Sequence, residues 1–267
     1  MKYKRIYIEI TNSCNLNCSF CTNEKGNRFL NIKDIEEIFN QIKEYTENIY
    51  LHVLGEPLLH PNIEEIFDLA NKYSLKINLV TNGTLLKKHL NILNKESLRK
   101  LSISVHSVKE IQIDNEYYKT LLEIIDNNND KYIELRFYEN KDNSFINILK
   151  EKYEFTNTDR INSYKLKENV YVLYGDYFKW PNINDELISD IGYCHGGIDQ
   201  LAILSNKDVT LCCLDPKGNN KIGNLNEKSF KDIINTKEYL KTIKELRNRK
   251  IVNDLCKKCS YRLKFFK

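Results

Sequence analysis

The chain has 267 residues, of which 41% are hydrophobic and 29% are charged, a composition typical of ordinary soluble globular proteins. The formal net charge of +4 is too small to indicate a nucleic-acid partner. No apolar run approaches the roughly 18 residues of a membrane span, and the N-terminus lacks the apolar core of a signal peptide. We therefore expect a cytoplasmic protein with neither a membrane nor a nucleic acid as its partner.

The first predicted element is a strand, because apolar and polar residues alternate over Ile6–Ile10. Directly after it come Cys14, Cys18 and Cys21, at C-x3-C-x2-C spacing. Three thiolates on one short loop can hold three irons of a cubane [4Fe–4S] cluster and leave the fourth iron open to a small ligand. Zinc sites favour separated C-x2-C pairs with four protein ligands, so this spacing indicates an open cluster.

The next part of the chain alternates strand and helix signals. Further strands are predicted at 49–54, 76–80, 101–105, 133–137 and 170–173, and helices at 32–45, 63–73, 118–125 and 145–153. Together with the first strand, this pattern predicts a parallel α/β sheet with right-handed crossovers. Functional residues of such sheets gather at the C-terminal ends of the strands, which is where the three cysteines stand.

The cysteine loop resembles that of the radical S-adenosylmethionine (SAM) enzymes. The resemblance includes the spacing of the cysteines, the residues Glu9–Ser13 before them, and the aromatic Phe20 before the third cysteine. It implies that the open iron binds the amine and carboxylate of SAM, and that Phe20 lies against the adenine. Six strands are too few for a closed eight-stranded barrel. The resemblance implies an open (β/α)6 partial barrel, which we assign to residues 1–180.

Two further strand ends carry residues that suit SAM. Gly55 and Glu56 follow the second strand and look like the family's Gly-Gly-Glu element, with Leu54 in place of its first glycine. A glycine lets the backbone approach a ligand closely, and Glu56 with nearby carbonyls can accept from an ammonium group. Ser104 and His106, at the end of the fourth strand, can reach a ribose or substrate hydroxyl. In each case an ordinary turn or a satisfied polar residue is the alternative.

Arg136 lies on the fifth predicted strand, between Leu135 and Phe137. A buried arginine requires an anionic partner, and in such a barrel the SAM carboxylate would serve. If the side chain instead points outward, Arg136 forms an ordinary surface salt bridge. A third polar candidate is Lys179, in Lys179-Trp180-Pro181, where either an acid/base group or packing between domains is expected.

The other five cysteines fall in the last quarter of the chain. A predicted hairpin at 201–204 and 209–212 follows Cys194, and a predicted helix at 230–246 precedes a C-x2-C pair. On the residues alone, four thiolates from separated pairs favour zinc. With the N-terminal motif, this arrangement, including the turn at 222–225, resembles the SPASM/twitch extension of radical SAM enzymes, here residues 181–267. The resemblance implies one auxiliary [4Fe–4S] cluster, with the ligands Cys194, Cys212, Cys256 and Cys259.

Cys212 and Cys213 compete for one ligand position. Neighbours on a strand point to opposite faces, so one of the two is expected to bind. The family pattern selects Cys212. His195 could replace a thiolate, but four cysteines suffice.

The resemblance implies an enzyme with SAM and two [4Fe–4S] clusters as cofactors. It would cleave SAM reductively to a 5′-deoxyadenosyl radical, abstract hydrogen from a substrate C–H bond and pass an electron to the auxiliary cluster. A flavodoxin- or ferredoxin-type protein would supply electrons. The general base is unassigned, with His106 and Lys179 as candidates.

The substrate is the least determined feature. Chain length and a single auxiliary site resemble the 2-deoxy-scyllo-inosamine dehydrogenases of the family, which indicates oxidation of a small sugar-like or aminocyclitol alcohol. The first alternative is a peptide maturase that forms a thioether, a crosslink or an epimer; the lack of room for a leader-binding domain before Tyr7 disfavours it. The second alternative is a non-enzymatic iron–sulfur or zinc-binding protein, which would not need an open three-cysteine loop.

Overall fold

The computed structural model describes residues 1–22, 26–110, 115–128, 130–139 and 144–265. The strands are β1 (Arg5–Ile8), β2 (Asn48–Tyr50), β3 (Lys76–Thr81), β4 (Leu98–Ser104), β5 (Tyr132–Tyr138), β6 (Thr156–Asn157), β7 (Ser163–Lys167), β8 (Val170–Gly175), β9 (Gln200–Ile203), β10 (Asp208–Thr210) and β11 (Lys221–Asn224). The α-helices are α1 (Ile32–Ile42), α2 (Ile63–Lys72), α3 (Asn115–Asn127), α4 (Ser144–Lys152), α5 (Phe230–Ile233), α6 (Lys237–Arg247) and α7 (Asp254–Lys257). The 3-10 helices are η1 (Pro57–Leu59), η2 (Leu86–Asn94), η3 (Val105–Glu110) and η4 (Ser260–Phe265).

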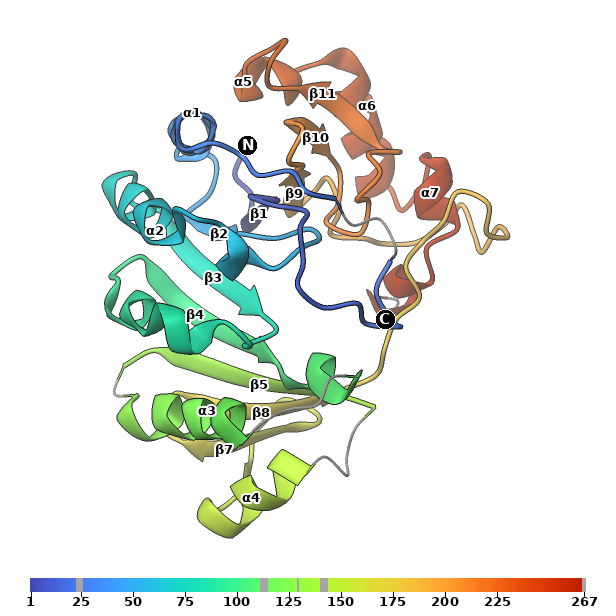
Figure 1. The fold of residues 1–267 in the computed structure, drawn as a ribbon. Coiled ribbons are helices and arrows are strands. Elements are labelled where there is room, and N and C mark those ends of the chain that lie inside the picture. The colour runs from blue at the N-terminus through green and yellow to red at the C-terminus, as the bar shows by residue number, and fades with distance from the viewer. Residues whose placement is uncertain (23–25, 111–114, 129, 140–143, 266–267) are drawn as a thin grey trace.

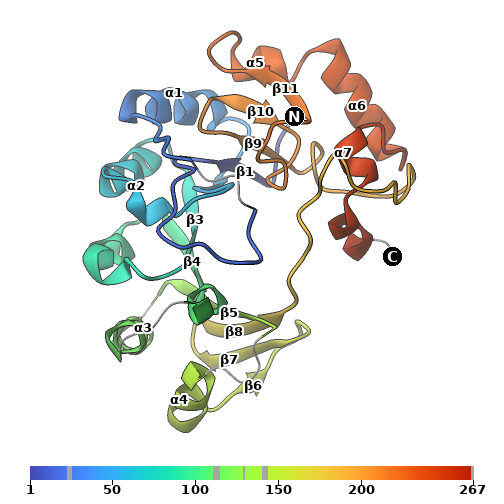
Figure 2. The ribbon, with the colours of Figure 1, turned by 45° about the vertical axis from the view of Figure 1, so that its right-hand side comes forward.

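All described strands belong to one sheet, in the order β11-β10-β9-β1-β2-β3-β4-β5-β8-β7-β6. The six strands predicted for the barrel, β1 to β5 and β8, are neighbours and run parallel, which confirms that prediction. The sheet curves without closing, and α1 to α4 lie along its outer side (Figures 1 and 2). The predicted open partial barrel is therefore confirmed.

Side-chain alternation orients the first strand. Ile6 and Ile8 are fully buried in the core, whereas Arg5 and Tyr7 are half-buried on the other face. Burying an isoleucine contributes about 1.5–3 kcal/mol, so a register in which the polar face turned to the core is disfavoured. The strand thereby turns Arg5 and Tyr7 toward the inside of the barrel, where both line a cavity.

The C-terminal hairpin continues the barrel sheet. The predicted hairpin is confirmed as β9 and β10, which pair antiparallel, and β9 in turn pairs parallel with β1. The phenol of Tyr239 on α6 donates to the Gly197 carbonyl at 2.7 Å and contacts the phenol of Tyr3 at 2.7 Å. These contacts tie α6 to the segments that precede the neighbouring strands β1 and β9. The domain boundary between residues 180 and 181 stays a prediction.

Three elements differ from the sequence-based prediction. Between the predicted helix at 145–153 and the predicted strand at 170–173, where no strand was predicted, the chain forms β6 and β7, which extend the sheet beyond β8 in antiparallel fashion. The predicted turn at 222–225 lies largely in strand β11. The helix predicted over 230–246 is two helices, because Ser229 and Thr236 each accept a backbone N–H of a new first turn.

Among the helices described, none is long and apolar enough to cross a membrane.

Candidate functional site

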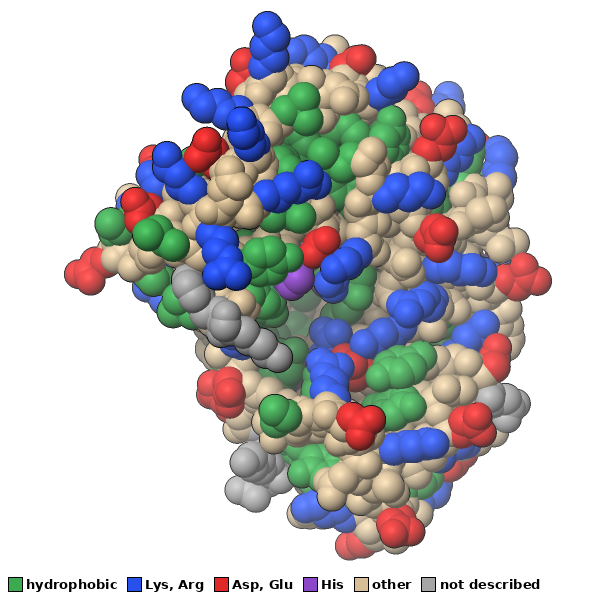
Figure 3. Space-filling model, turned by 180° about the vertical axis from the view of Figure 1, so that it is seen from behind, with side chains coloured by type: hydrophobic (Ala, Val, Ile, Leu, Met, Phe, Trp, Pro, Cys, Tyr) green, Lys and Arg blue, Asp and Glu red, His purple; other side chains and the backbone are tan. Residues whose placement is uncertain are grey.

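A cavity of about 450 Å³ lies between the inner face of the barrel and the C-terminal extension. Strands β1, β3, β4 and β5 contribute to one side of its wall, and residues from 177 to 265 to the other. Cys21 from the N-terminal group and Cys194, Cys212 and Cys259 from the C-terminal group all line it. Figure 3 shows the molecule from behind, with a hollow in which a histidine is visible and around which Lys and Arg side chains gather. Both predicted metal sites therefore border one space.

The N-terminal cysteines lie on the loop that follows β1. The Leu16 N–H donates to the Cys14 sulfur at 3.5 Å, and the Cys21 N–H donates to the Cys18 carbonyl at 3.1 Å. None of the eight cysteines, which all lie in the described part of the chain, forms a disulfide. Three reduced, half-buried thiols on one loop with an amide directed at sulfur fit a cluster that leaves one iron open. Their assignment as iron ligands stays a prediction.

Gly55 packs against the backbone that leads into the cysteine loop. Its φ is +80°, and a Cβ at this position would come within 2.4 Å of the Thr11 carbonyl oxygen. The next amide, of Glu56, donates to the Ser13 carbonyl at 2.8 Å. Only glycine allows the two loops to approach so closely. The close approach predicted for Gly55 is thus made to the protein's own backbone.

The Glu56 carboxylate is buried and used within the fold. It accepts from the Thr81 hydroxyl at 2.7 Å, the Asn82 amide at 2.8 Å and the Leu58 amide at 3.0 Å. Burial raises its pKa, and these hydrogen bonds oppose the rise. Neither Gly55 nor Glu56 lines the cavity, so the structure shows a supporting role for both. Their contact with SAM remains a prediction.

Aromatic rings form one side of the cavity. Phe20 stacks on Tyr177 with ring centroids 4.4 Å apart, and His106 stacks on Tyr138 at the same separation. His106 Nδ1 donates to the Arg136 carbonyl at 3.1 Å, so in the neutral ring Nε2 carries the lone pair. Ser104 also lines the cavity. The structure brings Phe20, Ser104 and His106 together as predicted candidates, whereas their contacts with SAM stay predictions.

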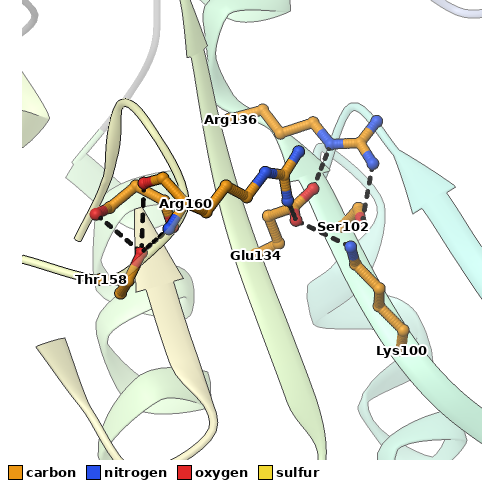
Figure 4. A network of polar contacts seen from close by, with 7 residues as sticks. Lys100, Ser102, Glu134, Arg136, Thr158 and Arg160 are labelled. Atoms are coloured by element: carbon orange, nitrogen blue, oxygen red, sulfur yellow. Dashed lines mark hydrogen bonds and ion pairs between the residues drawn. The ribbon is translucent and has the colours of Figure 1, made fainter. Parts of the chain in front are cut away.

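Arg136 has an anionic partner on its own strand (Figure 4). Its Nε lies 2.6 Å from Glu134, which is two residues earlier and so on the same face of β5. Lys100, at 2.7 Å, and Arg160, at 3.3 Å, bind the same carboxylate. Burial would raise the pKa of Glu134, but Arg136 and Lys100 outweigh it and lower the pKa to about 2. The surface salt bridge considered for Arg136 is wrong, since its side chain lines the cavity.

Lys179 lies outside the cavity. Its side chain is 70% exposed and its Nζ is 2.6 Å from Asp185. The flanking Phe178 and Trp180 line the cavity instead, since neighbouring side chains in an extended segment point to opposite sides. The prediction of Lys179 as an acid/base group is therefore not supported by its position.

Four C-terminal cysteines border one small pocket of about 30 Å³, namely Cys194, Cys212, Cys256 and Cys259. Their sulfurs accept from the Gly196 amide, the Leu214 amide and the Asn220 side chain, each at 3.4 Å. Amide donors of this kind stabilise thiolates bound to an iron–sulfur cluster.

Burial, followed by repulsion from the Cys212 thiolate, raises the pKa of Cys194 to about 12. Thiols in such surroundings deprotonate when a metal replaces their protons. In the described chain, no three His, Cys, Asp or Glu side chains are grouped tightly enough for a single metal ion. A four-iron cube is wider than one ion, so its thiolates stand further apart. The donor set thus fits an iron–sulfur cluster.

Cys213 lies apart from this pocket. It packs beside Tyr7 and the small cluster of Val53, Ala202 and Leu204, and it lines the larger cavity together with Cys212. The two sulfurs lie close together, since Gln200 Nε2 contacts Cys212 at 3.6 Å and Cys213 at 3.9 Å. The structure therefore places Cys212 with the other three thiols, as the family pattern selects.

Sequence reasoning missed part of the cavity wall. It considered His195 only as a replacement for a thiolate ligand and missed its pairing with Asp199. His195 Nδ1 lies 2.5 Å from the Asp199 carboxylate, and the i,i+4 spacing of this pair was present in the sequence. Arg5, Tyr7 and His52 also line the cavity. The alternation of polar and apolar residues over β1 was the available signal for Arg5 and Tyr7.

Comparison with known proteins identifies the family. Residues 8–143, slightly more than half of the chain, match the radical SAM superfamily. The chain belongs to the radical SAM superfamily. Residues 194–260 match SPASM, an iron–sulfur cluster-binding domain. The radical SAM enzyme therefore uses SAM and two iron–sulfur clusters, as the resemblance predicted.

Individual similarities are more distant. GTP 3′,8-cyclase from Aquifex aeolicus is 36% identical over 115 residues, which cover 39% of this chain and 36% of that protein. BtrN in complex with AdoMet and 2-DOIA is similar in fold, with a TM-score of 0.60 and 18% identity over 97% of this chain and 94% of BtrN. Streptococcus suis SuiB bound to its precursor peptide SuiA gives a TM-score of 0.65 and 16% identity over 98% of this chain and 72% of SuiB. The chain spans little more than a third of the cyclase, and the structural similarities show the fold alone.

Proposed function

We propose that this radical SAM enzyme is an oxidoreductase that dehydrogenates a small, sugar-like alcohol in the central cavity. The observation that carries the proposal is that both cysteine groups border the same space of about 450 Å³. That volume is in the range of ligand pockets, and SAM, oriented by residues of the same wall, would share the space with the substrate. A substrate held there would lie between the two predicted cluster sites.

When bound, SAM and the cluster at the N-terminal trio supply abstraction of a hydrogen atom from carbon, and the second cluster supplies an acceptor for one electron. Oxidation of an alcohol to a ketone requires, in addition, removal of the hydroxyl proton. His106 lines the cavity, and its Nε2 carries the lone pair because Nδ1 donates to the Arg136 carbonyl. We propose that His106 Nε2 accepts the proton of the substrate hydroxyl.

The chain also supplies position and a dry wall. Cys14, Cys18 and Cys21 would hold the first cluster, and Phe20, Ser104 and Arg136 would orient SAM beside it. The aromatic rings of Tyr138, Tyr177, Phe178 and Trp180 line the same cavity and limit the access of water. Water exclusion protects a substrate radical from side reactions.

A peptide maturase is the second candidate. SuiB bound to its precursor peptide SuiA has this fold, and its TM-score is slightly above that of BtrN. A third substrate to test is GTP, because the similar curated proteins include GTP 3′,8-cyclases. We further infer that the enzyme works in the cytoplasm, where its thiols stay reduced, and that a flavodoxin or ferredoxin reduces it.

The test is deuterium transfer into 5′-deoxyadenosine. The anaerobically reconstituted, reduced enzyme is incubated with SAM and, separately, with carbon-deuterated polyols and sugars, a deuterated peptide, or deuterated GTP. We expect label from a polyol or sugar, together with its ketone product, and loss of the ketone in His106→Phe. Label from the peptide or GTP in the absence of label from any alcohol would contradict the proposal.

A further inference from the structure

The charges around the cavity are of one sign. Three arginines line it, Arg5, Arg136 and Arg262, and the described residues place no Asp or Glu in its wall. Arg136 is paired with Glu134, which lies just outside the wall and also binds Lys100 and Arg160. Arg262 donates to the backbone carbonyls of Cys256, Ile191 and Ser189 on the side of the C-terminal cysteines. Arg5 is the third arginine, and it lies on the barrel side of the cavity, opposite Arg262.

Arg5 has no carboxylate partner in the described chain, and besides two tyrosines it faces the thiol of Cys213. Its guanidinium interacts with the hydroxyls of Tyr7 and Tyr50, whose rings stack at 4.7 Å. Among the ion pairs of the described residues, none involves Arg5. The side chain is half-buried. Because arginine stays charged at all physiological pH values, a partly desolvated guanidinium without an anion is costly, and an anionic ligand would relieve that cost.

His52 offers an unused polar atom beside the same two tyrosines. Its ring meets Tyr7 edge-on at 5.7 Å between centroids, and it lines the cavity. Nδ1 is buried and has no hydrogen-bond partner in the described structure. Burial, and then the charge of Arg136, lowers the pKa of His52 to about 3, so the ring is neutral. A buried polar atom without a partner destabilises the protein until a ligand satisfies it.

We propose that the cavity binds its substrate through an anionic group, a carboxylate or a phosphate, held by Arg5, with Tyr7 and His52 as neutral hydrogen-bonding partners. The substrate would then be an acidic sugar or a sugar phosphate. An aminocyclitol is disfavoured, because its ammonium group would face unbalanced arginines without a carboxylate to bind. This inference rests on the proposed function only for placing the substrate in the cavity.

Two other roles for Arg5 are distinguishable. The carboxylate of SAM is another anion to consider, but Arg136 on β5 is the residue assigned to it, whereas Arg5 is on β1. Alternatively, Arg5 could balance the negative charge of the C-terminal cluster. In that case its removal would change the potential of that cluster and leave ligand affinity unchanged.

The experiment measures binding to the reconstituted holoenzyme in the presence of SAM. Isothermal titration compares glycerol, glycerate and glycerol 3-phosphate, and then glucose, gluconate and glucose 6-phosphate. At least one anionic probe should bind at least about 10-fold more tightly than its neutral parent, and Arg5→Gln should weaken that probe by about 10- to 100-fold, as expected for a charge-assisted contact. Arg5→Lys should restore part of the loss, and His52→Phe should weaken the probe by about 5- to 30-fold.

The matched control is Lys4→Gln, which removes the same charge from the preceding residue of the chain. Lys4 is exposed and pairs with Asp199, away from the cavity wall, so probe binding should stay unchanged. SAM affinity, measured separately, should stay the same in Arg5→Gln.

The inference is overturned if no anionic probe binds more tightly than its neutral parent, if Arg5→Gln weakens SAM instead of the probes, or if only the cluster potential responds. Deuterium transfer separates this outcome from the proposed function. Anion binding without transfer from any alcohol would contradict the proposed dehydrogenation alone, whereas transfer from neutral alcohols without anion preference would contradict the inference alone.

Discussion

Glu134 is the anionic partner of three cationic side chains in the barrel, so its replacement by glutamine should destabilise the protein strongly. One carboxylate, 2% exposed, binds Lys100, Arg136 and Arg160. Glutamine keeps the size of the side chain but removes its charge. The buried guanidinium of Arg136 and the ammonium of Lys100 would then lack an anion, which is the mechanism by which breaking a buried ion pair is costly.

The magnitude follows from the pKa. The pKa of Glu134 is about 2, compared with its ordinary value of 4.5, because the cations outweigh the effect of burial. The difference corresponds to about 3 kcal/mol of stability, within the range of about 3–5 kcal/mol for broken buried pairs. A lowered pKa contributes stability above the unfolded value of 4.5, and this contribution is lost as the pH falls from 4.5 toward about 2. The loss caused by Glu134→Gln should therefore be constant between pH 6.5 and about 9.

Urea unfolding of the holoenzyme, followed by circular dichroism at several pH values in that window, measures the effect. Asp68→Asn is the matched control, because Asp68 is 64% exposed and binds Lys95 at 2.6 Å at the surface. Its loss should be below about 1 kcal/mol. Equal losses in both variants, or a Glu134→Gln effect that changes steeply between pH 6.5 and 9, would refute the electrostatic reasoning.

Further predictions concern the cysteines, a backbone contact and one excluded residue. Cys212→Ser should lower the iron content by about one four-iron cluster, and Cys213→Ser should leave it unchanged, as measured by iron analysis; the reverse would reassign the ligand. In the same unfolding assay, Gly55→Ala should lower the free energy of unfolding by about 3 kcal/mol or more, and Gly218→Ala should lower it by about 1 kcal/mol. Both glycines have a positive φ, but only at Gly55 would the added Cβ lie 2.4 Å from a backbone oxygen. Lys179→Ala should keep kcat and KM within about twofold of the wild type, because its ion pair is exposed, and a larger loss would return it to the site.

The parallel strands were predictable because buried strands appear in the sequence as short runs of apolar residues. The six runs of apolar residues in the barrel correspond to strands whose side chains pack on one continuous core. Helix signals between them left few arrangements other than right-handed crossovers. Antiparallel β6 and β7 were missed because β6 is two residues long and exposed, and three of the five residues of β7 are polar. Edge strands bury little, so their sequences carry a weak signal.

The site was predictable where spacing alone defines chemistry, as at Cys14, Cys18 and Cys21. It was not predictable where partners come from distant segments. The Glu134–Arg136 pair is visible in the sequence as a two-residue spacing on one strand. Lys100 reaches the same carboxylate from the neighbouring strand β4, and Arg160 reaches it from the turn between β6 and β7. Gly55 was expected at a ligand, yet its neighbour is the backbone at Thr11, which only the tertiary fold brings there.

The pairing of β1 with β9 explains why two cysteine groups so distant in sequence share a cavity. The strands run parallel, with Arg5 opposite Gln200 and Ile8 opposite Ile203. The N-terminal cysteine loop leaves the end of β1, and the hairpin returns from the end of β9 to Cys212. A shift of one residue in this register would turn Arg5 and Tyr7 into the core and Ile6 toward the cavity, which the burial of Ile6 and Ile8 opposes. The same apolar residues that build the core therefore fix the separation between the two predicted cluster sites.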